Sequence, residues 1–490
     1  MLKSNEKKLF WLVLLSLIAI RLINITMPIL EGTAMRQVQT AMIARNFYRD
    51  GFNILYPRVD FFGNSAGYLV LEFPLFNVLA ALGYKTLGGV HEWVGRLLSI
   101  LFFSGAASFL YGITKRLFSI KTAIWALFIF GILPLSVIFS RTFMPDFEML
   151  FFSLGALYFF LIFYLKGKYM PYWLSAIFLS LALLIKPHSF YIFFPLAYLL
   201  WKKQNIKFAI DYKNWLYLII ALLPAFFWYL HGQAVHSKFT LEQAFNYEIT
   251  NWFNPKEFFN MDLYKDLFQI YAGILLTPIG LTLFIAGLFI KTKDNGKLIW
   301  AWLAGSIVYL LAFITHINDP YYNLNMLPIV SIFIARAIVF IEETSSSDKI
   351  FKSRWAKAFL AIVILTIWLR YALYAYVVPQ GYRYIPEAGA RIKQITGKDD
   401  LVIASAASGP QALYFCDRKG WGLRIHKLDK KNVEKSINCL EDLRKKGAKF
   451  FISTVMSDFE KNTSFSEHMF KNYKLIERKP KKFIIFSLSK

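Results

Sequence analysis

Long apolar stretches recur along the chain from Leu9 to Val378, and many approach the ~20 residues that a helix needs to cross a bilayer. Between them lie short segments rich in Lys, such as TKRLFSIKT, YLKGKYMP and KTKDNGK. Because short basic loops stay on the cytoplasmic side of membrane proteins, this alternation predicts about eleven transmembrane helices. The first would run outward from Leu9, and the last would end near Val378 with the remaining chain outside.

The composition agrees with a polytopic helical membrane protein, which we expect in the cytoplasmic (inner) membrane. The chain is 57% hydrophobic with a mean hydropathy of +0.43, which is too apolar for a water-soluble globule. A net charge of +25 is explained better by basic loops facing anionic membrane lipids than by a nucleic-acid partner, so we expect no nucleic acid. Cys416 and Cys439 both lie in the tail, and their number leaves a disulfide or two free thiols open.

Two stretches of the first outer loop are predicted to lie along the membrane surface. If YLVLEFPLFNVLAALGYKTLG crossed the membrane, every later basic loop would move to the other side, so a surface or re-entrant helix fits better. The segment MRQVQTAMIARNFYRDG has the same mixed character and a stop signal at Gly51. The first outer loop therefore runs from about Pro28 to Trp93 and contains two helices.

A polar interruption divides the apolar stretch from Tyr172 to Trp201, where KPHS stands in its middle. Two short crossings of about 14 residues each keep the flanking basic loops on one side, and they leave Lys186 and His188 below the outer surface. An ammonium at such depth costs roughly 2.5–3.5 kcal/mol on insertion scales. We therefore expect Lys186 to face a polar cavity and to meet an anion.

With this topology the unusual polar residues gather at the outer face from separate loops. They are Glu31, Arg36, Glu72, Arg141, Asp146, Lys186, His188, His316, Asp319, Tyr321 and Tyr322. Carboxylates can act as a general base or bind a divalent cation, while Arg and Lys can hold a phosphate. Such a set at the membrane surface suits a substrate whose lipid tail stays in the bilayer.

Each of these residues also has a structural interpretation, which the sequence leaves open. Glu31 and Arg36 could lie at the interface with their charges in water, and Glu72 could cap a surface helix. Asp146 follows Pro145 and could cap the next span. His316 and the tyrosine pair could belong to an interfacial aromatic belt.

An ordered series of segments resembles a known family. The segments are EGTAMRQVQTAMIARNFYRDGFNILYPRVDFFG, EFPLF, GRLLS, SRTFMPD, LLIKP and HINDPYYNLNMLP. They are similar to bacterial protein O-mannosyltransferase-like glycosyltransferases, which share the GT-C membrane fold with protein O-mannosyltransferases and lipid A aminoarabinose transferases. The resemblance covers about residues 9–341. It implies a transferase that takes a sugar from a polyprenyl-phosphate donor on the outer side of the membrane and passes it to a lipid, glycan or protein acceptor.

The resemblance also implies roles for the polar residues. We predict Glu31 and Asp146 as catalytic carboxylates, with Glu31 as the base, and we predict a divalent metal ion, if one is used, at Glu72. The donor phosphate is assigned to Arg36, Lys186 and Arg141, and other substrate contacts to Gln37, His188, His316, Tyr321 and Tyr322. Relatives more often have Asp at the position of Glu31, followed by a His and an aromatic residue where this chain has Thr33 and Met35.

After Val378 the pattern changes to that of a small α/β domain. The stretches DDLVIAS, GAKFFIST and KKFIIFSLS predict buried strands, and KNVEKSINCLEDLRKKG predicts an amphipathic helix that ends at Gly447. We therefore predict a transmembrane catalytic domain over residues 1–378 and an extracytoplasmic domain over residues 379–490. The many Lys of this domain could face anionic lipid or an acidic acceptor, although a solvated basic face explains them better.

Two other functions remain as alternatives. A transporter or flippase of lipid-linked sugars would need polar residues near mid-span and an internal repeat, and the sequence displays neither. A polymerase of lipid-linked glycans is chemically closer to the predicted transferase. The sequence alone specifies neither the sugar nor the acceptor.

Overall fold

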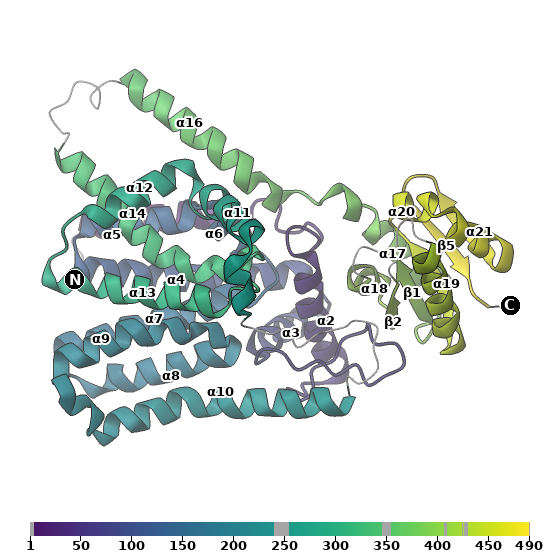
Figure 1. Ribbon diagram of the computed structural model, residues 1–490, viewed down its shortest axis with the longest axis horizontal. Coiled ribbons are helices and arrows are strands. Elements are labelled where there is room, and N and C mark those ends of the chain that lie inside the picture. The colour runs from purple at the N-terminus through teal and green to yellow at the C-terminus, as the bar shows by residue number, and fades with distance from the viewer. Residues whose placement is uncertain are drawn as a thin grey trace. The chain divides into compact units, whose positions relative to one another are not determined.

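The computed structural model describes residues 4–239, 254–344, 354–405, 409–423, 425 and 430–489 (Figure 1). Packing divides the chain into two compact units, each of which is described by itself. We call Met1–Ile25, Gly95–Tyr229 and Ile249–Tyr376 the helical unit, and Thr26–Val94, Leu230–Glu248 and Val377–Lys490 the loop–tail unit. The first outer loop thus packs with the tail, which the sequence pattern did not predict, while the predicted division at residue 378 into a catalytic and an extracytoplasmic domain stays a prediction.

Most of the apolar helices lie wholly or mainly in the helical unit. Their bounds are α1 (Ser4–Leu22), α4 (Glu92–Leu117), α5 (Ile120–Ile132), α6 (Pro134–Phe139), α7 (Asp146–Lys166), α8 (Tyr169–Ile185), α9 (Phe193–Gln204), α10 (Tyr212–Phe239), α11 (Met261–Gln269), α12 (Thr277–Phe289), α13 (Leu298–Ala312), α14 (Leu327–Thr344) and α16 (Arg354–Ala372).

By length and composition, five helices among the described residues could each cross a membrane, and a sixth span is formed if the pair around Leu276, bent by 97°, counts as one. Four more apolar helices are shorter, with 10–17 residues. The fold is that of a polytopic helical membrane protein, and its number of apolar helices is roughly consistent with the prediction of about eleven. Parts of two predicted loops, at residues 240–253 and 345–353, lie outside the described residues.

Local sequence signals explain where several helices begin and end. The side chain of Ser119 accepts a hydrogen bond from the amide of Thr122 and caps α5, and Gly167 ends α7 with a φ of +71°. Small residues let aromatic side chains approach the helix backbone. At Gly155 of α7 an added Cβ would lie 2.2 Å from the ring of Phe178 on α8, so only glycine permits this packing.

The predicted break at KPHS is confirmed as two helices rather than one bent span. Helix α8 ends at Ile185, the short 3-10 helix η1 (Pro187–Ile192) follows, and α9 then continues the chain. Lys186 itself is extended, with φ −147° and ψ 123°, as expected for the residue before a proline. The break is what brings the Lys186 side chain into the buried part of the helical unit.

The first outer loop contains the two helices that the sequence predicts. They are α2 (Ala34–Asp50), which ends at Gly51 with a φ of +94°, and α3 (Leu75–Leu87). At 13 residues, α3 is too short to cross a bilayer as a regular helix. Both helices belong to the loop–tail unit, together with α17 (Ile385–Ile395), α18 (Pro410–Cys416), α19 (Lys430–Lys445), α20 (Met456–Lys461) and α21 (Thr463–Asn472).

The tail forms a five-stranded sheet in the order β2-β1-β3-β5-β4. The three predicted strands are confirmed as β1 (Leu401–Ser405), β3 (Ala448–Ser453) and β5 (Phe483–Ser487), and the predicted helix is α19, followed by Gly447 in a left-handed conformation. Strands β2 (Gly420–Gly422) and β4 (Lys474–Lys479) were not predicted. Strands β2, β1 and β3 are parallel, and β5 and β4 are antiparallel additions.

A buried charge network joins the first outer loop to the tail within the loop–tail unit. Arg45 on α2 pairs with Asp60 and, at 2.9 Å, with Asp417, which also receives two hydrogen bonds of 2.6 and 2.8 Å from Arg49. Burial opposes the ionisation of Asp417, but the hydrogen bond from Arg49 and the charges of both arginines outweigh it and lower its pKa to about 2. Beside this network, Cys416 is buried, and both it and the exposed Cys439 are free thiols.

Candidate active site

The candidate site of the helical unit centres on a buried ion pair between α7 and the end of α8. The Lys186 ammonium donates to Asp146 Oδ1 at 2.5 Å, and both side chains are nearly inaccessible to solvent. The predicted anion beside Lys186 is therefore the Asp146 carboxylate. Asp146 is the first residue of α7, and the N-cap position before it is occupied by Pro145. Its second oxygen, Oδ2, has no hydrogen-bond partner among the described residues.

An aromatic cluster lies next to this pair. The ammonium of Lys186 is 5.1 Å from the centre of the Tyr321 ring, which in turn is 4.4 Å from the ring of Tyr322. The His188 ring lies 5.1 Å from Tyr322, and the His316 ring stacks on Tyr322 at 5.5 Å. These four residues come from η1 and from the segment around η6 (Pro320–Met326), so the structure brings together six of the predicted site residues.

Arg141 belongs to the same helical unit but contacts main-chain oxygens. Its guanidinium donates to the carbonyls of Arg21, Ile23, Asn24 and Ala375, and it stacks on Tyr376. Arg21, a neighbour in this cluster, donates to the carbonyls of Leu17 and Gly131 and to the side-chain hydroxyls of Ser136 and Ser140. The predicted phosphate role of Arg141 stays a prediction, and the observed contacts hold α1 to the segment between α6 and α7.

The remaining predicted residues lie in the loop–tail unit, on and around α2. Glu31 is buried at 1% exposure, and its carbonyl accepts a hydrogen bond of 2.7 Å from the side chain of Gln37. Arg36 donates to Gln39 and binds both oxygens of Glu72, at 2.8 and 3.1 Å. Gln37 thus shapes the start of α2, and Arg36 and Glu72 are partners of each other rather than two independent groups.

A divalent metal at Glu72 is not favoured by these contacts. Within the described ranges, no three His, Cys, Asp or Glu side chains gather closely enough to hold a metal ion. The Glu72 carboxylate is moreover engaged by the guanidinium of Arg36. The metal at Glu72 therefore stays a prediction from the sequence, and no step below depends on it.

Sequence reasoning missed two buried polar residues of the helical unit that lie near the predicted ones. Tyr309 on α13 donates its hydroxyl to the carbonyl of Tyr322 at 2.9 Å, and its ring lies 5.6 Å from that of His188. Glu148 is fully buried two positions after Asp146. A second carboxylate within the apolar stretch DFEML was the available signal for Glu148, whereas Tyr309 lies in an ordinary apolar helix and gave none.

Comparison with known proteins gives one family model and several structures. The model described as dolichyl-phosphate-mannose-protein mannosyltransferase matches residues 72–229. An uncharacterized protein of Aquifex aeolicus is 25% identical over 423 residues, which cover 79% of this chain and 80% of that protein.

The matching structures resemble this chain over nearly its full length. Apo ArnT from Cupriavidus metallidurans aligns with a TM-score of 0.66 at 12% identity, covering 99% of both chains. The archaeal oligosaccharyltransferase AglB from Archaeoglobus fulgidus aligns with a TM-score of 0.58 at 12% identity, covering 100% of this chain and 75% of AglB. The chain therefore adopts the membrane fold of the GT-C glycosyltransferases.

Proposed function

We propose that this protein is a membrane glycosyltransferase that takes a sugar from a polyprenyl-phosphate donor, and that Lys186 contacts the donor phosphate. The observation that carries the proposal is the buried Asp146–Lys186 pair with its unpartnered carboxylate oxygen. Two relatives in fold support the donor class, since ArnT has been solved with undecaprenyl phosphate and AglB with a dolichol-phosphate and an inhibitory peptide.

Each member of the Asp146–Lys186 pair can bind one part of a glycosyl phosphate: Lys186 the phosphate and Asp146 the sugar. An ammonium has three N–H donors, and only one of those on Lys186 is directed at Asp146, so further donors remain for a phosphate oxygen. The Asp146 Oδ2 atom can accept a hydroxyl of the sugar, which would relieve the cost of burying that oxygen unpaired. The rings of Tyr321, Tyr322 and His316 supply an apolar face against which a sugar ring can pack.

The proposed reaction is a single displacement at the anomeric carbon. The acceptor oxygen forms the new bond to that carbon, the bond from carbon to phosphate oxygen breaks, and polyprenyl phosphate leaves with the bonding electrons. Lys186 would stabilise the charge that grows on the leaving phosphate, an interaction that strengthens in the transition state. The acceptor proton passes to a carboxylate, for which Glu31 stays our prediction from the sequence.

Binding of undecaprenyl phosphate to the purified full-length protein tests the donor assignment. A charged hydrogen bond contributes about 1.5–3 kcal/mol, so Lys186→Ala should weaken this binding roughly 10- to 150-fold. Lys115→Ala is the matched control, because Lys115 pairs with Glu6 at 3.6 Å in the same unit but is partly exposed. Equal affinities for the wild type and Lys186→Ala would refute the role of Lys186.

We propose the outer face of the cytoplasmic membrane as the side of the reaction, on the basis of the basic-loop alternation. A cysteine at the exposed Asn64 should then react with an impermeant thiol reagent on intact cells, and one at the exposed Lys168 should not. Ser119 lies in another of the basic loops, but its side chain caps α5, so Lys168 is the safer inner position. Reversed labelling would contradict this side.

The glycan product distinguishes a transferase from the two alternatives, a transporter and a polymerase. A transferase or polymerase makes a new glycosidic bond, whereas a transporter returns the donor unchanged. Mass spectrometry of surface glycolipids and glycoproteins from cells with and without the gene would show whether a single sugar is missing, as a transferase predicts, or a whole chain of sugars, as a polymerase predicts.

A further inference from the structure

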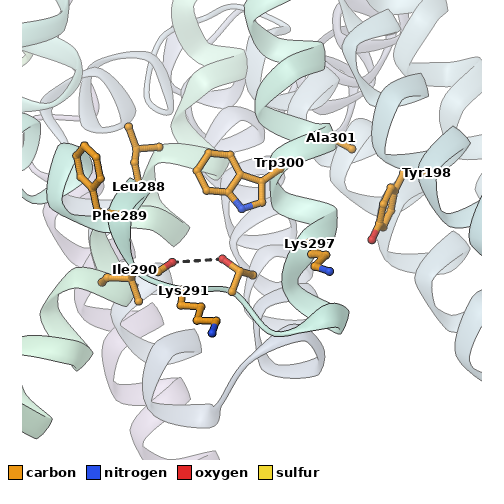
Figure 2. A pocket seen from close by; sticks show the side chains of 9 residues that line it. Tyr198, Leu288, Phe289, Ile290, Lys291, Lys297, Trp300 and Ala301 are labelled. Atoms are coloured by element: carbon orange, nitrogen blue, oxygen red, sulfur yellow. Dashed lines mark hydrogen bonds between the residues drawn. The ribbon is translucent and has the colours of Figure 1, made fainter.

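A groove of about 490 Å³ opens on the surface of the helical unit between the end of α12, the start of α13 and Tyr198 of α9 (Figure 2). It lies apart in sequence from the Asp146–Lys186 pair, and the proposed reaction does not use it. Its lining is of two kinds, with an apolar wall and a rim of lysines.

The apolar wall consists of Leu288, Phe289, Trp300 and Ala301. Phe289 is 85% exposed and Trp300 is 39% exposed. Helix α12, on which Phe289 lies, is part of a helix pair that is apolar enough to cross a membrane. Exposed aromatic surface of this size is favourable only where an apolar partner covers it. The wall therefore points to an occupant with a hydrocarbon part.

The rim carries a positive charge. The loop between α12 and α13 contains Lys291, Lys293 and Lys297 with one carboxylate, Asp294, which pairs with Lys297 at 2.6 Å. Both members of that pair are largely exposed, and such pairs are weak, so Lys297 can turn toward another anion. The charge of Lys202, on the last turn of α9, also favours the ionised form of Asp294, so a second segment adds positive charge near this loop.

An arginine holds the main chain at the end of α12, beside the groove. Arg336 of α14 donates to the carbonyl of Ile290 at 2.6 Å and to that of Lys291 at 3.3 Å. The end of a helix normally repels anions because its last carbonyls are unpaired. At the end of α12 the guanidinium of Arg336 offsets this effect, which makes the rim more favourable for a negative headgroup.

We propose that this groove binds one anionic phospholipid, with its phosphate at Lys291 and Lys297 and an acyl chain against Phe289 and Trp300. The occupant needs both a hydrocarbon chain and a net negative charge, which together match the wall and the rim (Figure 2). A zwitterionic lipid matches the wall only, because its own cation would face the lysines.

The experiment compares phosphatidylglycerol with phosphatidylcholine of the same acyl chains on the delipidated full-length protein, by native mass spectrometry in detergent. Phosphatidylglycerol should bind saturably as one molecule and at least about tenfold more tightly than phosphatidylcholine, as expected for one charged hydrogen bond. The double variant Lys291→Ala/Lys297→Ala should lose this preference. The control Lys166→Ala/Lys168→Ala, which removes two exposed lysines from another basic loop of the same unit, should keep it.

Three outcomes would overturn the proposal. They are equal binding of the two lipids, an unchanged preference in the Lys291/Lys297 variant, and an equal loss in the Lys166/Lys168 control, which would indicate general attraction to basic loops. Undecaprenyl phosphate is the second probe, since it also has a phosphate and a hydrocarbon chain. Its affinity should be the same in the Lys291/Lys297 variant, and a loss there together with intact phosphatidylglycerol binding would assign the groove to polyprenyl phosphate instead.

Discussion

Two buried charge clusters of this protein contain the same kinds of groups and differ in how completely their carboxylate oxygens are bonded. In the loop–tail unit, each carboxylate oxygen of Asp60 and Asp417 accepts a hydrogen bond or ion pair from Arg45, Arg49 or Asn46. In the helical unit, Asp146 has only Lys186 as a hydrogen-bond partner among the described residues, and its Oδ2 atom has none.

The difference separates a structural role from a ligand-binding one. A buried charge network with every carboxylate oxygen bonded fixes the chain and has little left to offer a ligand. A buried carboxylate with an unpaired oxygen is unfavourable by itself, and a hydrogen-bond donor of a ligand would stabilise it. We therefore interpret the Arg45 cluster as the clamp between the first outer loop and the tail, and we propose the Lys186 cluster as the donor site.

The largest effect, a loss of turnover, is expected for Glu31→Gln. This variant tests the chemical step, whereas the comparison above concerns binding and stability. The change keeps the size of the side chain but removes its ability to take a proton, and general base catalysis typically contributes ~10²–10⁴-fold. Turnover should fall by that order while undecaprenyl phosphate still binds. Nearly normal turnover of the purified variant would transfer the role of base to Asp146.

The next effect concerns the stability of the loop–tail clamp. Arg45→Ala leaves Asp60 and Asp417 without their shared buried cation, and breaking a buried pair typically costs about 3–5 kcal/mol. Thermal unfolding and protease sensitivity of the tail should report this loss. Arg49→Ala is the matched control, because Arg49 is 43% exposed and should contribute no more than about 1 kcal/mol. Equal effects of the two variants would show that burial does not distinguish them.

A smaller effect is expected for Lys186→Arg in the helical unit. The charge is kept, but a planar guanidinium presents its donors differently from a compact ammonium, so only part of the undecaprenyl phosphate affinity should remain relative to Lys186→Ala. The dissociation constants of the three proteins, measured in one detergent, check the order wild type, Arg, Ala. Affinity of the Arg variant below that of the Ala variant would mean that the site excludes a larger cation.

The smallest effect is a pH dependence of the clamp. Because the folded-state pKa of Asp417 is lowered to about 2, its stabilising contribution is present above its ordinary pKa of 3.8 and is lost as the pH falls toward 2. For a partly exposed group this contribution is at most about 1 kcal/mol. The thermal midpoint of the wild type should therefore fall more between pH 5 and pH 3 than that of Asp417→Asn. Equal falls would show that Asp417 does not contribute.

The sequence predicted the features that short-range patterns determine. The apolar periods, Gly51, Gly447 and the KPHS break gave the helices and their ends, and three apolar strands gave the core of the tail sheet. Strand β2 has only three residues, two of them glycine, and β4 reads KLIERK, so neither has the apolar pattern of a buried strand.

Contacts between distant residues could not be predicted in this way. The depth of Lys186 predicted an anion, but not that Asp146, forty positions earlier, would supply it. The phosphate roles of Arg141 and Arg36 stay predictions, but the sequence did not predict that Arg141 bonds main-chain carbonyls or that Arg36 bonds Glu72. A cation in a sequence indicates that an anion or a carbonyl is needed, and only the fold determines which one is present.

The most direct test of the central claim is the double variant Asp146→Asn/Lys186→Met. Replacing both members of a buried ion pair by neutral groups of similar size is often neutral or even stabilising, whereas the donor site would lose its cation and its carboxylate together. We predict a thermal midpoint close to that of the wild type, with undecaprenyl phosphate binding weakened by at least about tenfold. A marked loss of stability with unchanged binding would contradict the account, because the pair would then be a structural clamp like that of Arg45.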